Sequence, residues 1–122
     1  METETLTVNG VTIAVVNSAE KITTPQSALD LAVTVKYETG AQRIAIPKRL
    51  LPEEFFILSS GLAGEILQKY INYGIKMAVW GDFSRYTSKP LHDFIYESNH
   101  GKDFFFVGTR EQAVDRLAGA AL

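Results

Sequence analysis

The sequence predicts an α/β fold with a mixed, mostly parallel sheet of about five strands, an N-terminal β-hairpin and about four helices. Three observations indicate this fold. An Asn-Gly pair at positions 9 and 10 separates two β-branched runs, which is typical of a tight hairpin. After it, short apolar runs alternate with amphipathic segments, so crossover helices should join parallel strands. The length of 122 residues fits one domain, and we expect residues 1–122 to form it.

The first elements are the hairpin and one helix. Residues 6–8 and 11–16 are rich in the β-branched side chains that strands favour. Thr24 and Pro25 mark the start of the helix, because threonine caps helices well and proline fits a first position whose N–H needs no partner. Gly40 is expected to end this helix.

The middle of the chain predicts a strand, a connection and a second helix. Residues 43–46 form a short apolar strand that Pro47 ends. The apolar segment 50–58 contains a proline and two glutamates, which predicts a lid-like connection with one helical turn. A second helix is expected to begin at Ser60, since apolar residues then recur at one-turn spacing until Gly74.

The C-terminal part predicts two further strands and two further helices. Residues 76–80 read as a strand and residues 88–99 as a helix. The continuous apolar run 104–107 is typical of a strand covered on both faces. Thr109 with Gln112 forms a capping box at the start of the last helix.

Composition excludes several classes of function. With 12 basic and 14 acidic residues, a net charge of −2 and no run of like charge, we expect neither nucleic-acid nor membrane binding. The absence of cysteine excludes disulfides, thiol catalysis and thiolate metal sites. The acidic start and the short apolar runs resemble neither a signal peptide nor a membrane span, so we expect a cytoplasmic protein. No motif supports catalysis, and we expect no metal or other cofactor.

Two sets of residues resemble known protein families and narrow the choice of fold and function. The sequence Ser59-Ser60-Gly61-Leu62, followed by an amphipathic helix, a glycine and Met77-Ala78-Val79, resembles the centre of a STAS domain, the fold of sulfate-transporter tails and anti-sigma factor antagonists. The order of elements is also similar. Longer stretches resemble an uncharacterised bacterial family, domain of unknown function four-one-eight-zero; they comprise residues 61–69, 81–84, 86–89 and 93–99. The second resemblance implies no activity.

Ser60 has two interpretations. In STAS antagonists the second serine of such a pair is the phosphoacceptor that switches binding to a kinase-like partner, and the resemblance places Ser60 there, with Ser59 before it. Leu58 stands where those proteins usually carry an aspartate. The alternative, which we favour, is an ordinary helix N-cap. In the functional interpretation, Gly61 and Gly64 leave backbone N–H groups open to an anion, whereas with an ordinary N-cap these glycines let the helix pack close to the sheet.

Polar residues that follow the strands form a second candidate site. The carboxyl ends of parallel strands meet at one edge of a sheet, where open α/β folds bind ligands. Asp82 with Arg85 and Lys89 could hold a small anion, or these side chains could be solvated loop residues. The full set comprises Lys48, Arg49, Asp82, Ser84, Arg85, Tyr86 and Lys89.

Phe55 and Phe56 suggest a third feature. The connection 50–57 carries too many apolar side chains for a free loop, which predicts either a lid over the core or an association surface in a homodimer.

These observations favour a non-catalytic regulatory or protein-interaction module of bacterial signalling, similar to anti-sigma factor antagonists, with a kinase-like or other regulatory protein as its partner. The alternative is a small anionic ligand-binding protein, or a weak enzyme, that uses a pocket at the carboxyl ends of the strands.

Overall fold

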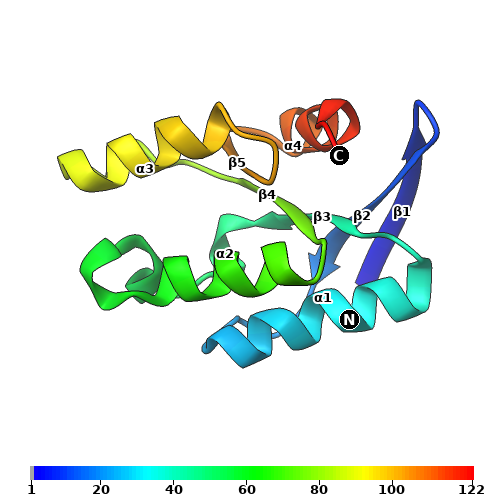
Figure 1. Cartoon of the computed structure of the whole chain (residues 1–122), viewed down its shortest axis with the longest axis horizontal. Coiled ribbons are helices and arrows are strands. Elements are labelled where there is room, and N and C mark those ends of the chain that lie inside the picture. The colour runs from blue at the N-terminus through cyan, green and yellow to red at the C-terminus, as the bar shows by residue number, and fades with distance from the viewer. Residues whose placement is uncertain (1) are drawn as a thin grey trace.

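The computed structural model describes residues 2–122 and contains one five-stranded sheet (Figure 1). Its strands are β1 (Glu2–Val8), β2 (Val11–Ser18), β3 (Arg43–Pro47), β4 (Lys76–Trp80) and β5 (Phe104–Val107). They lie in the order β1-β2-β3-β4-β5, so each strand neighbours the one before it in the chain. β1 and β2 pair antiparallel, and all other pairs are parallel.

Four α-helices cover the sheet: α1 (Pro25–Thr39), α2 (Leu62–Asn72), α3 (Lys89–Asn99) and α4 (Arg110–Gly119). Buried residues of α1, α2 and α3 belong to a large hydrophobic cluster on one face, and α4 packs in a smaller cluster on the other (Figure 1). The predicted mixed, mostly parallel sheet, its hairpin and the four helices are confirmed. Within residues 2–122, no helix is long and apolar enough to cross a membrane.

The pleat of the strands sends alternate side chains to the two clusters. In β4, Met77 and Val79 belong to the larger cluster and Ala78 to the smaller one, and all three are fully buried. β5 shows the same alternation, with Phe104 and Phe106 on one face and Phe105 on the other. The central strands are therefore covered on both faces, which explains why they are apolar throughout.

Local sequence signals set the ends of several elements. Asn9 and Gly10 have φ angles of 51° and 79°, the left-handed conformation that a two-residue hairpin turn requires. The Thr24 hydroxyl caps α1 by accepting a hydrogen bond from the Ser27 backbone N–H at 3.0 Å. Thr109 caps α4 in the same way. The predicted hairpin turn and both caps are confirmed.

The start of α2 differs from the prediction. Residues Leu58–Ser60 form a short 3₁₀ turn, and the helix begins at Leu62 rather than at Ser60. Gly61 takes the N-cap position with a φ angle of 80°, which glycine adopts without steric cost. The capping signal was therefore assigned to the wrong residue, because a serine is favoured at an N-cap only when the backbone there is extended.

The connection between β3 and α2 folds into three 3₁₀ turns, η1 (Lys48–Leu50), η2 (Glu53–Phe56) and η3 (Leu58–Ser60), where one turn was predicted. Phe55 is fully buried and Phe56 is 6 % exposed. Their rings contact Phe106 and Tyr86, with ring centroids 6.1 Å and 4.7 Å apart, respectively. Both rings are buried against the chain's own residues, as a lid over the core requires. The homodimer contact stays a prediction.

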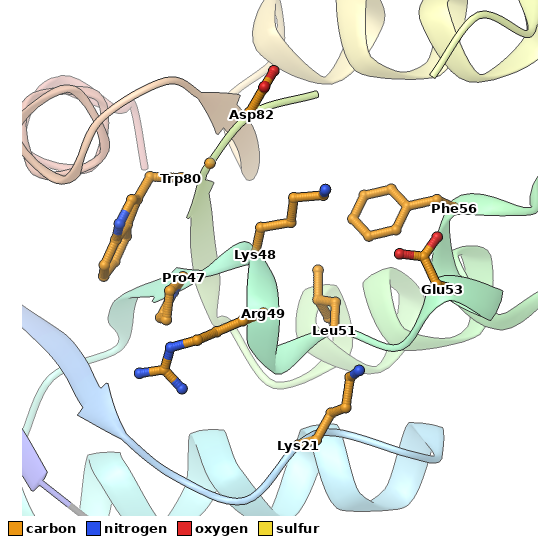
Figure 2. Close-up of a pocket in the computed structure, with 10 residues that line it drawn as sticks. Lys21, Pro47, Lys48, Arg49, Leu51, Glu53, Phe56, Trp80 and Asp82 are labelled. Carbon is orange, nitrogen blue, oxygen red and sulfur yellow. The ribbon is translucent and has the colours of Figure 1, made fainter. Parts of the chain in front are cut away.

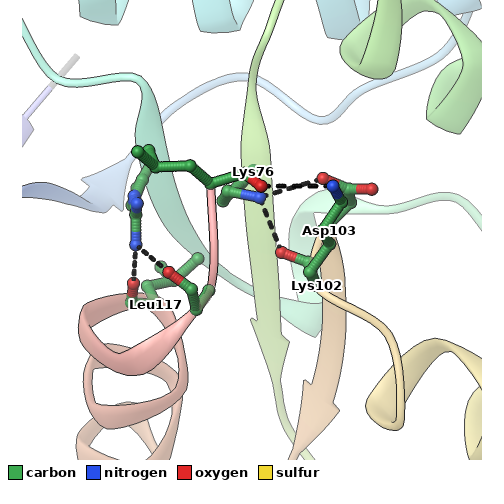
Figure 3. A network of polar contacts seen from close by, with 7 residues as sticks. Lys76, Lys102, Asp103 and Leu117 are labelled. Carbon is green, nitrogen blue, oxygen red and sulfur yellow. Dashed lines mark hydrogen bonds and ion pairs between the residues drawn. The ribbon is translucent and has the colours of Figure 1, made fainter.

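The amino ends of the strands are closed by basic side chains (Figure 3). Lys76 at the start of β4 is 8 % exposed, and its ammonium donates to the Lys102 carbonyl oxygen at 2.8 Å and to an Asp103 carboxylate oxygen at 3.0 Å. Arg43 of β3 donates to the carbonyl oxygens of Leu117 and Ala120 at the end of α4. Both cations at this edge are satisfied by oxygens of the chain itself, as partly buried charges require.

Candidate functional site

A pocket of about 440 Å³, which we call the strand-end pocket, opens at the carboxyl ends of β3 and β4 (Figure 2). This is the edge at which open α/β sheets bind ligands. The pocket is lined by Lys21, Pro47, Lys48, Arg49, Leu51, Glu53, Phe56, Trp80, Gly81 and Asp82. The predicted residues Lys48, Arg49 and Asp82 are thus brought together at one cavity.

Three cations line this pocket. Lys48 and Arg49 come from η1, directly after β3, and Lys21 comes from the connection between β2 and α1. Arg49 donates to the Asn17 carbonyl oxygen at 2.7 Å. Within residues 2–122, the side chain of Ser18 excepted, the ammonium groups of Lys21 and Lys48 form no hydrogen bond or ion pair. This contrasts with Lys76 at the opposite edge, whose ammonium donates to two oxygens.

Aromatic rings hold the Lys48 ammonium in place. It lies 4.8 Å from the ring centroid of Tyr86, 5.8 Å from that of Phe56 and 6.0 Å from that of Phe83. Such cation–π contacts attract the charge without neutralising it. Gly81 makes the arrangement possible, because a Cβ atom there would lie 2.7 Å from the Lys48 Cβ. Lys48 is therefore a positioned positive charge beside an open cavity.

Two carboxylates also line the pocket, and each has its own partner. Glu53 forms an ion pair with Arg85, which lies over the Tyr86 ring. Asp82 accepts a hydrogen bond from the Ser84 backbone N–H at 2.9 Å. Hydrogen bonds from Ser84 and, to a smaller extent, the charge of Lys48 lower the pKa of Asp82, so its carboxylate is ionised at neutral pH. These partners restrain both carboxylates at the rim of the pocket.

The structure separates the predicted trio of Asp82, Arg85 and Lys89. Arg85 pairs with Glu53, and Lys89 pairs with Asp93 one turn along α3 at 2.6 Å. Neither Arg85 nor Lys89 lines the strand-end pocket. Their charges are satisfied by nearby carboxylates instead, a pairing that the helix spacing of Lys89 and Asp93 favours.

Two residues of the pocket, the aromatic Trp80 and the cationic Lys21, were not predicted from the sequence. Trp80 ends β4, and its place at the end of a predicted strand was the signal that could have found it. Lys21 carries no such signal, because it stands in an irregular connection. A backbone hydrogen bond from the Ile22 N–H to the Leu50 carbonyl oxygen, at 2.7 Å, ties this connection to η1 and places Lys21 at the pocket.

Ser60 lies outside the lining of the strand-end pocket. Its exposed hydroxyl donates to the Glu54 carbonyl oxygen at 2.9 Å and accepts from the Leu62 backbone N–H at 3.2 Å. The Ser60 hydroxyl therefore accepts a bond from the first residue of α2, as a capping side chain does, although Gly61 occupies the N-cap. A Cβ at Gly64 would meet no atom within 4 Å, so this glycine does not serve close packing of the helix on the sheet. Ser59 and Gly64 are both exposed.

No group of three or more histidine, aspartate or glutamate side chains within residues 2–122 is placed to hold a metal ion. His92 donates from Nε2 to the Tyr86 carbonyl oxygen, and His100 from Nδ1 to that of Tyr96 at 2.8 Å. Each imidazole is thus used in a local contact.

The fold and the pocket together define an α/β protein with a basic cavity at the carboxyl edge of its sheet. Comparison with protein families identifies the family: the chain belongs to the one described as Domain of unknown function (DUF4180), whose family model matches residues 8–117. The family predicted from the stretches at 61–69 and 93–99 is confirmed. Comparisons with curated proteins and with solved structures find no match to the chain.

Proposed function

We propose that the chain binds a small anionic ligand in the strand-end pocket. The observation that carries this proposal is the pair of ammonium groups of Lys21 and Lys48, which border an open cavity without a partner in the described chain. The net charge of the protein is −2, so this local excess of positive charge does not reflect a generally basic chain. Three cations line the pocket against two carboxylates, and one of these, Glu53, is paired with Arg85, so the pocket keeps an excess of positive charge that attracts anions.

The chemistry of the pocket favours binding over catalysis. Glu53 and Asp82 are the carboxylates available for proton transfer, and both are restrained by other partners. The pKa of Asp82 is lowered, which makes it a poor base at neutral pH. Among the side chains that the structure describes, no serine, threonine or histidine lines the cavity. The cations can hold a carboxylate or phosphate through charge-assisted hydrogen bonds.

Calorimetric titration with inorganic phosphate, sulfate and acetate tests this function. We expect at least one anion to bind, with an affinity that falls as salt is added. Lys21→Gln and Lys48→Gln should each weaken binding about tenfold, the loss of one hydrogen bond to a charged group. Lys36→Gln, at an exposed position in the last turn of α1, is the matched control and should bind as the wild type does. Absence of binding by all anions, or equal binding by Lys48→Gln, would contradict the proposal.

A second candidate function is a regulatory protein-interaction module of the bacterial cytoplasm, similar to anti-sigma factor antagonists. It is supported by the resemblance to STAS domains around Ser60 and by the exposed position of this serine before α2. A phosphate on Ser60 would remove the proton that the hydroxyl donates to Glu54 and so weaken the tie between η2 and η3. A kinase-like protein, or a second copy of the chain, would then sense this change.

The second candidate has its own test. Intact mass spectrometry of protein from cells, together with capture of partners by wild type, Ser60→Ala and Ser60→Asp, reports on it directly. A mass increase of one phosphate on Ser60, and a partner that Ser60→Asp fails to retain, would support it. Unmodified protein and equal capture by all three forms would exclude the switch.

A further inference from the structure

We infer that the anionic ligand of the strand-end pocket carries a planar ring, and that this ring binds against Trp80. The inference rests on the proposed function, because it names the class of anion that the same pocket takes. The ligand class is a phosphate monoester joined to an aromatic or heterocyclic group.

The pocket has two chemically different sides (Figure 2). On one side lie the Trp80 indole, Pro47 and the guanidinium of Arg49. On the other side Lys48 extends towards Phe56, and Lys21 reaches up from the β2–α1 connection. The carboxylate of Glu53, which is paired with Arg85, lies on this second side as well. A ligand that fills the cavity therefore meets flat groups at one end and the ammonium groups of Lys21 and Lys48 at the other.

The size of the cavity argues against a bare oxyanion. A volume of about 440 Å³ falls within the range of small-molecule sites. An inorganic phosphate has five heavy atoms and would leave most of this space to solvent, with the exposed part of the indole still wet. A larger ligand can displace that water and cover the apolar wall.

The groups at the Trp80 side favour a planar ligand. Trp80 is half-buried: it packs in part against the smaller hydrophobic cluster and in part lines the pocket. Indole faces stack on aromatic and heterocyclic rings. The guanidinium of Arg49 is itself planar and is held by the Asn17 carbonyl oxygen, with further N–H donors left for a ligand. Aliphatic ligands would gain no comparable contact.

The cations indicate the charge of the ligand. Lys21 and Lys48 line the pocket with Arg49, whose guanidinium is only partly engaged, while of the two lining carboxylates Glu53 is paired with Arg85. A phosphate monoester carries about −1.5 to −2 charge at neutral pH, so it can use more than one of these cations, whereas a single carboxylate carries one charge. A nucleoside monophosphate and a phosphorylated aromatic metabolite share this chemistry, and the experiment below separates them.

Calorimetric titrations with methyl phosphate, phenyl phosphate and adenosine monophosphate test the inference. We expect phenyl phosphate or adenosine monophosphate to bind wild-type protein at least about tenfold more tightly than methyl phosphate, the contribution of one stacking contact. Trp80→Leu should abolish this advantage, so that the variant binds phenyl phosphate and methyl phosphate with about the same affinity. Trp80→Phe, which keeps a ring, should retain most of the advantage. Preference for adenosine monophosphate over phenyl phosphate indicates a nucleotide, and the reverse indicates an aryl phosphate.

The same titrations separate failure of the inference from failure of the proposed function. Lys48→Gln should weaken binding of methyl and phenyl phosphate by the same factor, because it acts on the shared phosphate. Equal affinity of the wild type for methyl phosphate and phenyl phosphate would refute the inference that the ligand carries a ring. It would leave the proposed anion binding intact. An advantage that persists in Trp80→Leu, when circular dichroism shows the variant folded, would also overturn the inference. Absence of binding by all three ligands would overturn the inference and the proposed function together.

Discussion

Replacing Gly81 by alanine should lower the free energy of unfolding by about 1–3 kcal/mol, the usual cost of an overpacked site. The added Cβ would lie 2.7 Å from the Cβ of Lys48 and 3.2 Å from its Cδ. The first of these atoms is bonded to the backbone of η1, so rotation of the lysine side chain cannot move it away. Gly81 is also held in place, since its N–H donates to the Val107 carbonyl oxygen at 3.0 Å. Relief therefore requires a shift of η1 itself.

The shift of η1 has a second consequence, for the strand-end pocket. Moving η1 displaces Lys48 from the rings of Phe56, Phe83 and Tyr86, so Gly81→Ala should also weaken anion binding. Urea unfolding followed by circular dichroism measures the stability, and calorimetry with inorganic phosphate measures the binding.

Gly64→Ala is the matched control for this substitution. Gly64 lies in α2, and a Cβ there would meet no atom within 4 Å. The control should therefore stabilise the protein, by about 0.5–1 kcal/mol, because alanine loses less conformational entropy than glycine in a helix. If Gly81→Ala unfolds at the same urea concentration as the wild type while Gly64→Ala is stabilised, then η1 is not packed against Gly81 and the argument for a positioned Lys48 is wrong.

Three further substitutions, at Tyr70 and Ser60, test the contacts in α2 and at its start. The buried Tyr70 hydroxyl donates to the Ala28 carbonyl oxygen at 2.7 Å, and burial raises the pKa of Tyr70, so it remains a donor. Tyr70→Phe should therefore lower the free energy of unfolding by about 1 kcal/mol in urea titrations, and an unchanged midpoint would show that this bond does not join α1 to α2. Ser60→Ala should cost about 1 kcal/mol, and Ser60→Asp at least as much, because a carboxylate cannot donate to the Glu54 carbonyl. If Ser60→Asp is as stable as the wild type, then only the hydrogen bond that residue 60 accepts from the Leu62 N–H contributes to the free energy of unfolding.

Most of the fold could be predicted from the sequence because its signals are local. The turn at Asn9 and Gly10 and the caps at Thr24 and Thr109 each depend on residues within one turn of the chain. The alternation of strands and helices then implies parallel pairing, since crossover connections leave few other arrangements. The same rule located Lys48 and Asp82 at the pocket, because residues that directly follow parallel strands meet at one edge.

The features of the fold that the sequence did not predict depend on contacts between residues far apart in the chain. The sequence left the surroundings of Phe55 and Phe56 open, and the packing of their rings on Phe106 and Tyr86 joins residues about 30 to 50 positions apart. The start of α2 depended on the backbone angle that Gly61 adopts once the lid is folded, which no pattern of side chains encodes.

The strand-end pocket contains both kinds of residue: those that the sequence predicts and those that only tertiary contacts bring to the site. Lys48 and Asp82 follow predicted strands, and the sequence alone was enough to name them as candidate site residues. Lys21 joins them through the hydrogen bond between Ile22 and Leu50, two residues in irregular segments on different connections. Local propensity determines where strands and helices begin and end, whereas a site assembled from loops exists only after the core has brought those loops together.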